Sequence, residues 1–116
     1  MAAGGAVGCV ARYLGALAAA PWSAGFPWGT FAINVAGSFV LGALLGGMPP
    51  GHPGRLLFGT GFCGGFTTFS TFSTEVVALV ERGAVGRAGV YAGGSVVAGV
   101  LAAAVGAVVG RAVTAR

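Results

Sequence analysis

The chain has 116 residues, of which 56% are hydrophobic and 7% are charged, and its mean hydropathy is +0.92. A soluble domain of this size needs a more polar surface, so the composition indicates a membrane protein. The net charge of +4 comes from arginines that are spread along the chain and form no basic patch interleaved with aromatic residues, and we therefore expect no nucleic-acid partner.

Four stretches are long and apolar enough to cross a membrane, which takes roughly 20 residues of helix for a hydrocarbon core of about 30 Å. They lie at approximately 4–20, 28–47, 56–81 and 88–111. The connections between them are short and contain Pro, Gly or Arg, so none is expected to fold by itself. The sequence therefore predicts an all-α, multi-pass protein of the cell membrane, with one transmembrane domain over residues 1–116 that is surrounded by the lipid bilayer.

The first stretch resembles a secretory signal only superficially. Ala18, Ala19 and Ala20 are similar to a cleavage site, but no basic leader precedes the apolar run and Arg12 interrupts it. We interpret this stretch as a transmembrane helix.

Charge placement barely favours either orientation. With four crossings, Arg55, Arg111 and Arg116 share one side of the membrane, and Arg82 and Arg87 lie on the other. The positive-inside rule then selects no orientation, so copies inserted in both directions would be available to pair. We expect an antiparallel, dual-topology homodimer, because four short helices are also too few to enclose a polar pathway.

Glycines spaced four residues apart let helix backbones approach in lipid. Each of the four stretches contains at least one such pair, and we expect each pair to mark a packing face. The pairs are Gly4/Gly8, Gly42/Gly46, Gly61/Gly65, Gly89/Gly93 and Gly106/Gly110.

Several polar residues lie inside the apolar stretches. An ionisable or amide group at membrane depth is costly unless it faces protein or water, so a functional or interface role is favoured for Arg12, Asn34 and Glu75. A hydroxyl can instead bond to the carbonyl one turn earlier, and this alternative stays open for the serines and threonines. The residues in question are Thr30, Ser38 and Ser95, and Tyr91 lies one turn before Ser95.

The third stretch is predicted to break in its middle. Four glycines, at 59, 61, 64 and 65, precede three threonines within five positions, so helix propensity is poor between Gly64 and Ser70. A break would expose carbonyls, which attract cations, and N–H groups, which attract anions. In an antiparallel dimer a cation could be held near the midplane by carbonyls of both chains. Phe69 and Phe72 follow on one helical face, either as core residues or with their positive ring edges toward an anion.

No residues indicate an enzyme or a side-chain metal site. His52 has no acid or nucleophile fixed beside it, and Cys9 and Cys63 are expected to be free, structural residues because they lie far apart in apolar surroundings.

Three motifs resemble a known family. GAVGCVARY (5–13), GTFAINVAGSFVLG (29–42) and GTGFCGGFTTFSTFSTE (59–75) are similar, in order and spacing, to the signature motifs of the Fluc (CrcB) fluoride channels. The resemblance implies a dual-topology dimer that exports fluoride passively through two pathways and confers fluoride resistance. It also implies a structural sodium ion at the dimer interface, bound by the backbone carbonyls of Gly64 and Thr67.

The resemblance further assigns the fluoride pathway. It implies that Phe69 and Phe72 line the pore with their ring edges, that Asn34 donates to fluoride near its entrance and that Arg12 lies toward a vestibule. The polar side of the path would come from Thr71, Ser95 and Tyr91, with Glu75 and Thr30 close by. One turn after Ser95 the chain has Gly99 in place of another hydroxyl, a gap that water could fill.

Two other classes remain open from the residues alone. A small multidrug-resistance-type antiporter is also a four-helix, dual-topology dimer, but it needs a membrane-embedded carboxylate, and here the first stretch carries Arg12 and no acid. Proton coupling through Glu75 stays possible. A helical scaffold would explain the glycine faces but not Asn34 or the hydroxyl run. The assignment of fluoride as the transported ion rests only on the resemblance.

Overall fold

The computed structural model describes residues 1–115 and contains helices but no strand in that range, which confirms the all-α class. Arg116, one of the charges counted above, lies outside the described residues. In chain order the elements are α1 (Ala2–Ala19), the 3₁₀ turn η1 (Ala20–Trp22), α2 (Trp28–Gly47), the π-helical segment η2 (Arg55–Cys63), α3 (Gly64–Phe66), α4 (Phe69–Glu81) and α5 (Val85–Thr114).

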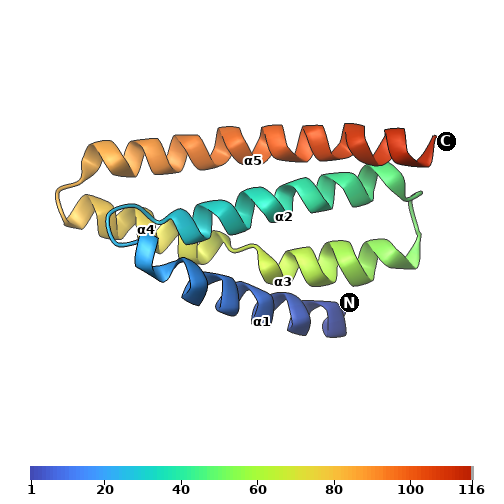
Figure 1. Cartoon of the computed structure of the whole chain (residues 1–116), viewed down its shortest axis with the longest axis horizontal. Helices are drawn as coiled ribbons and strands as arrows, with labels where there is room; N and C mark the ends of the chain where they lie inside the picture. The colour runs from blue at the N-terminus through green and yellow to red at the C-terminus, as the bar shows by residue number, and fades with distance from the viewer. Residues whose placement is uncertain (116) are drawn as a thin grey trace.

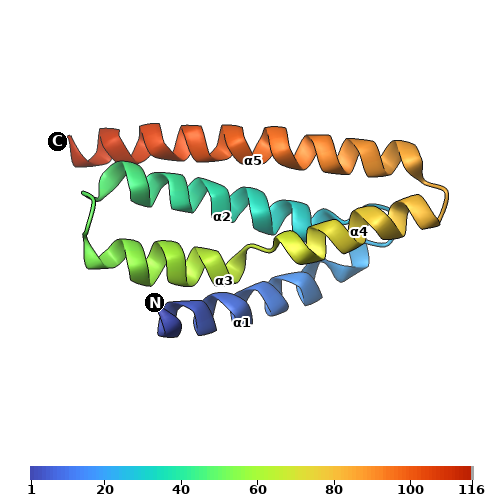
Figure 2. The same ribbon diagram turned by 180° about the vertical axis from the view of Figure 1, so that it is seen from behind.

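The helices form an elongated bundle with extents of 49 × 27 × 21 Å (Figure 1). Helix α5 packs along α2, and α1 packs along the η2–α3 segment. Both termini point toward the same end of the bundle as the connection between α2 and η2, and the other two connections lie at the opposite end (Figure 2). This arrangement agrees with the predicted alternation of the four stretches.

Three continuous helices are long and apolar enough to cross a membrane within the described residues: α1 continued through η1 to Trp22, α2, and α5. The predicted stretch 28–47 coincides with α2, whereas α5 is longer than the predicted 88–111 and α1 begins two residues earlier than expected. The stretch 56–81 is not one helix. It is divided between η2, α3 and α4 by Thr67 and Thr68.

Glycine pairs bring α2 and α5 into backbone contact. A Cβ on Gly42 would collide with the Ala103 carbonyl, and a Cβ on Gly106 would collide with the Phe39 carbonyl. The second glycine of each pair, four residues later, is placed in the same way. Because close backbone packing drives helix association in lipid, this interface fixes how α5 faces α2.

A second set of glycines joins α1 to the η2–α3 segment. Gly4 and Gly8 approach the carbonyls of Leu57 and Phe62, and the pair Gly61/Gly65 approaches the backbone of α1 from the other side. The packing role predicted for four of the five pairs is therefore confirmed. At the fifth pair, Gly89/Gly93, a Cβ would meet nothing within 4 Å in the described part of the chain.

The connection after α2 is held by Arg55. Its Nε and Nη2 donate to the Met48 carbonyl at 3.0 and 2.6 Å, and Nη2 also donates to the Leu45 carbonyl at 2.8 Å. A cation at a helix C-terminus neutralises the negative end of the helix dipole, so this arginine stabilises the end of α2. Both cysteines are free, as expected; Cys63 is buried and Cys9 is exposed.

Candidate functional site

The break between α3 and α4 is an extended dipeptide. Thr67 has ψ 158° and Thr68 has φ −150° and ψ 120°, values that β-branched residues adopt readily. Thr68 is also the N-cap of α4, because its side-chain oxygen accepts from the Thr71 N–H at 3.2 Å. The predicted break therefore exists, and it falls inside the predicted range of 64 to 70.

Two backbone donors are diverted at the break. The Thr68 N–H, which would bond to the Gly64 carbonyl in a continuous helix, donates instead to Asn34 Oδ1 at 2.9 Å. The Thr71 N–H, which would bond to the Thr67 carbonyl, donates to the Thr68 side chain. The carbonyls of Gly64 and Thr67 thus lose their helical donors, and these are the two carbonyls that the resemblance assigns to a cation.

Asn34 connects α2 to the break through two bonds. Besides accepting from the Thr68 N–H, its Nδ2 donates to the Thr68 carbonyl at 3.2 Å. One side-chain amide therefore bonds to both backbone groups of the N-cap residue of α4. This role was not predicted, although the cost of an amide at membrane depth did single out Asn34.

Arg12 reaches the other side of the same segment. This half-buried residue of α1 donates from Nε to the Gly65 carbonyl, at 3.2 Å, in the last turn of α3. A cation at that position complements the negative end of the half-helix. The sequence led us to expect Arg12 near a vestibule; the structure shows it bonded to the backbone beside the break.

A cavity of about 270 Å³ lies between α2, the break and α5. It brings together five of the predicted site residues: Asn34, Thr67, Phe69, Phe72 and Ser95. Four further lining residues, Gly37, Ser38, Thr68 and Gly99, extend its wall along the helices. The remaining predicted site residues lie outside this lining, namely Arg12, Thr30, Gly64, Thr71, Glu75 and Tyr91.

The two phenylalanines of α4 lie together but differ in burial. Their ring centroids are 5.8 Å apart, with 39° between the planes. Phe72 also packs against Tyr91, at 5.1 Å between centroids, whereas Phe69 is 79% exposed. A ring this exposed in the middle of an apolar segment leaves one wall of the cavity incomplete in a single chain.

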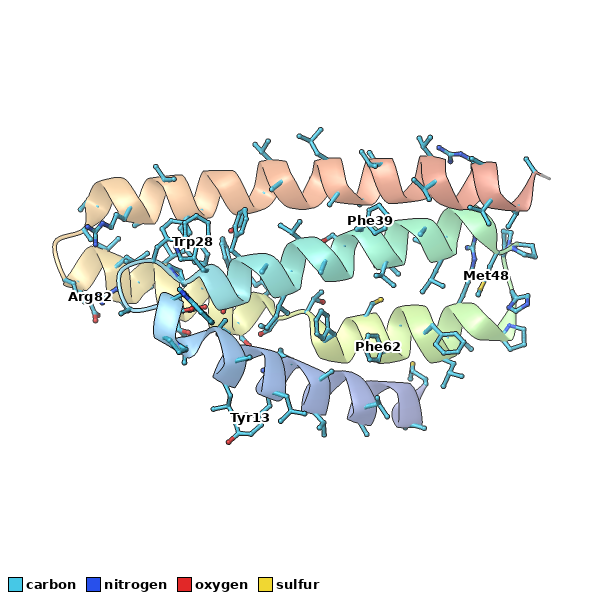
Figure 3. The ribbon with its side chains drawn as sticks, viewed as in Figure 1. Tyr13, Trp28, Phe39, Met48, Phe62 and Arg82 are labelled. Carbon is cyan, nitrogen blue, oxygen red and sulfur yellow. The ribbon has the colours of Figure 1, made fainter. Side chains whose placement is uncertain are left out.

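Tyr91 and Glu75 form a polar pair beside this cavity. Tyr91 is fully buried, and its hydroxyl donates to Glu75 Oε1 at 3.3 Å, with the Thr30 hydroxyl nearby. Glu75 also lines a second cavity of about 100 Å³, together with Ser23 and Arg82. Glu75 therefore faces the end of the bundle where Trp28 and Arg82 lie (Figure 3).

The hydroxyl groups around the break differ in their hydrogen bonding. Thr71 accepts from the Thr68 hydroxyl at 3.2 Å, so it supports the N-cap of α4. Ser95 lines the cavity, and its Oγ is buried without a hydrogen-bond partner among residues 1–115. Ser38 also lines the cavity, and the signal for it in the sequence is its position one turn after Asn34, which places both residues on one helix face.

Side-chain metal ligands are not gathered in residues 1–115: no three His, Cys, Asp or Glu residues lie together there. The freed carbonyls of Gly64 and Thr67 are oxygen donors of the kind that hard cations prefer.

These features define a multi-pass helical membrane protein with polar groups gathered at an interrupted helix. The family model described as "CrcB-like protein, Camphor Resistance (CrcB)" matches residues 1–107, and the chain belongs to this family. The resemblance of the three motifs is thereby confirmed.

Relatives match over most of their length and share one name, "Fluoride-specific ion channel FluC". The protein of Novosphingobium aromaticivorans is 52% identical over 106 residues, which cover 86% of this chain and 84% of the relative. That of Phenylobacterium zucineum is 47% identical over 117 residues, covering 94% and 91%. That of Caulobacter vibrioides is 42% identical over 117 residues, covering 96% and 92%.

Proposed function

We propose that this protein is a fluoride-selective, passive ion channel of the cell membrane that exports fluoride from the cytoplasm and confers fluoride resistance. The observation that carries the proposal is the identity of 52% to a relative named as a fluoride-specific ion channel, over 86% of this chain. The cavity beside the helix break supports it, because that cavity is lined by apolar side chains, two phenylalanines and polar groups. The relatives do not favour the multidrug-resistance-type antiporter.

The working unit is an antiparallel, dual-topology homodimer of chains that each cross the bilayer four times. Three crossings are α1, α2 and α5, and the remaining one, third in chain order, is the interrupted segment formed by η2, α3 and α4. Two features support a partner chain: Phe69 is 79% exposed, and the face with Gly89 and Gly93 has open space beside it. A second copy would cover both features and would bury apolar surface that a single chain leaves open.

The Gly64 and Thr67 carbonyls of each chain would hold a structural sodium ion at the dimer interface. Support comes from the diversion of the Thr68 and Thr71 N–H groups, since it leaves those carbonyls without helical donors. Asn34 then supports the sodium site by holding the Thr68 backbone, without contacting the ion. Replacing sodium by a large organic cation is expected to weaken the dimer.

Fluoride passes along the cavity lined by Asn34, Phe69, Phe72 and Ser95. Fluoride holds its water tightly, so a pathway must replace that water with donors of positive character. Ring edges carry the positive side of the aromatic quadrupole, and the amide and hydroxyl groups donate hydrogen bonds. Thr71 fixes the start of α4, and Thr30, Glu75 and Tyr91 continue the polar side toward one bundle end.

Arg12 contributes at a distance from the ion. Its bond to the Gly65 carbonyl holds the half-helix in place, and its charge favours anion entry.

Efflux from liposomes tests this proposal. Purified protein is reconstituted in vesicles that are loaded with fluoride or chloride, and an ionophore dissipates the opposing charge. We expect rapid fluoride release and negligible chloride release, with fluoride release lost in Phe69→Ile. Equal release of both anions, or no fluoride release from folded dimeric protein, would refute the proposal.

A further inference from the structure

Two pairs of residues, one on α2 and one on α5, line the cavity beside the break. On α2, Asn34 and Ser38 are one turn apart, and on α5, Ser95 and Gly99 are one turn apart. All four residues line the same cavity. On α2 both positions carry a polar side chain, whereas on α5 the second position, Gly99, has no side chain.

The hydroxyl of Ser95 is poised for a ligand. Two threonine hydroxyls near the break bond back to the carbonyl four residues earlier: Thr67 to Cys63 at 2.8 Å and Thr74 to Ser70 at 3.2 Å. Ser95 makes no such bond, and its Oγ is buried without a hydrogen-bond partner in the described part of the chain. A buried, unpaired hydroxyl costs free energy, so its retention in a cavity wall indicates a polar occupant.

Gly99 leaves the next position on α5 empty, and α2 supplies a hydroxyl there. A Cβ built on Gly99 would lie 3.7 Å from Ser38 Oγ, which is ordinary van der Waals contact. The Ser38 hydroxyl therefore lies next to the position that a side chain at residue 99 would occupy.

We propose that Ser38 is a fluoride-binding residue of the pathway, an inference that rests on the proposed function. Its hydroxyl and that of Ser95 form a pair that spans α2 and α5 and donates to the ion beyond Asn34. The polar lining then changes helix at Gly99, from α5 to α2. No ordered water is required to fill the gap at Gly99.

The test moves this hydroxyl from one helix to the other. Because a hydrogen bond to a charged group is worth about 1.5–3 kcal/mol, Ser38→Ala is expected to lower the fluoride efflux rate by about tenfold or more. The double variant Ser38→Ala with Gly99→Ser returns a hydroxyl to the same place, within the available space, and is expected to restore most of the rate.

The matched control is Ser38→Ala with Gly99→Ala, which adds the same Cβ without a hydroxyl and is expected to stay slow. A purely structural role for Ser38 would not distinguish these two double variants. Should Ser38→Ala fail to fold, Ser38→Cys serves instead, since it keeps the volume and weakens the donor.

Three results separate the possible outcomes. An unchanged fluoride rate in folded Ser38→Ala overturns the inference while leaving the proposed function intact. Equal rates for the two double variants also overturn it, because the hydroxyl is then irrelevant. Absence of fluoride efflux from the wild-type protein would instead overturn the proposed function, and this inference with it.

Discussion

Replacing Asn34 with alanine is expected to loosen the helix break as well as the ion pathway. The substitution removes both bonds to Thr68, at 2.9 and 3.2 Å, and leaves the Thr68 N–H unpaired at membrane depth, while the Thr68 carbonyl, as the N-cap carbonyl, keeps its place at the start of α4. Side-chain hydrogen bonds inside membrane proteins contribute on average about 0.6 kcal/mol and at most about 1.7, so two of them amount to roughly 1–3 kcal/mol. We expect the free energy of unfolding to fall by that amount.

The assay measures unfolding in mixed micelles of mild and denaturing detergent, followed by far-ultraviolet circular dichroism, alongside fluoride efflux. Phe69→Ile is the matched control, because Phe69 is 79% exposed in the protomer and touches neither bond. Asn34→Ala should lower both stability and efflux, whereas Phe69→Ile should lower efflux with little change in protomer stability. If Asn34→Ala lost efflux at unchanged stability, Asn34 would act on the ion alone, and the reasoning about the break would be refuted.

Three further predictions follow from the helix packing, the half-buried carboxylate of Glu75 and the freed carbonyls. Gly106→Ala is expected to destabilise the protein, because its Cβ would collide with the Phe39 carbonyl, while Gly89→Ala, which meets nothing within 4 Å, should be neutral in the protomer. Thermal unfolding of the two variants compares them on one helix. Glu75→Gln is expected to keep electrogenic fluoride flux, because the amide can still accept from the Tyr91 hydroxyl; flux measured with and without a pH gradient checks this. Exchange of sodium for N-methylglucamine is expected to shift the protein from dimer to protomer, measured by light scattering at constant ionic strength.

Each of these expectations has a result that would contradict it. Equal melting temperatures for Gly106→Ala and the wild type would mean that α2 and α5 are not in backbone contact. Loss of proton-dependent transport in Glu75→Gln would point to coupled exchange. A dimer that is indifferent to sodium would remove the role proposed for the Gly64 and Thr67 carbonyls.

Helix placement was predictable where local signals are strong. Residues 28–47 were found because Pro27 precedes the apolar run and Pro49 follows it, and α2 has those bounds. The break was predictable because glycines and β-branched threonines both disfavour a helix, and no side chain elsewhere was needed to infer it. The π-helical form of η2 was not predicted, since nothing in its composition distinguishes a wider turn from an ordinary one.

The bonds that hold the break could not be read from the sequence. Arg12 reaches Gly65 only because Gly4 and Gly8 let α1 approach the η2–α3 segment closely. Asn34 meets Thr68 across 34 positions, a pairing that depends on the relative height of two helices. The free-energy cost of placing a polar side chain at membrane depth identified both residues as important. Their hydrogen-bond partners, however, depend on tertiary packing.

The most direct test of the central claim is the current through protein reconstituted in a voltage-clamped planar bilayer, with fluoride on both sides and no pH gradient. A passive fluoride channel predicts a steady current that reverses at the fluoride equilibrium potential and disappears when chloride replaces fluoride. A current carried equally by chloride, or transport that appears only with an imposed proton gradient, would contradict the account.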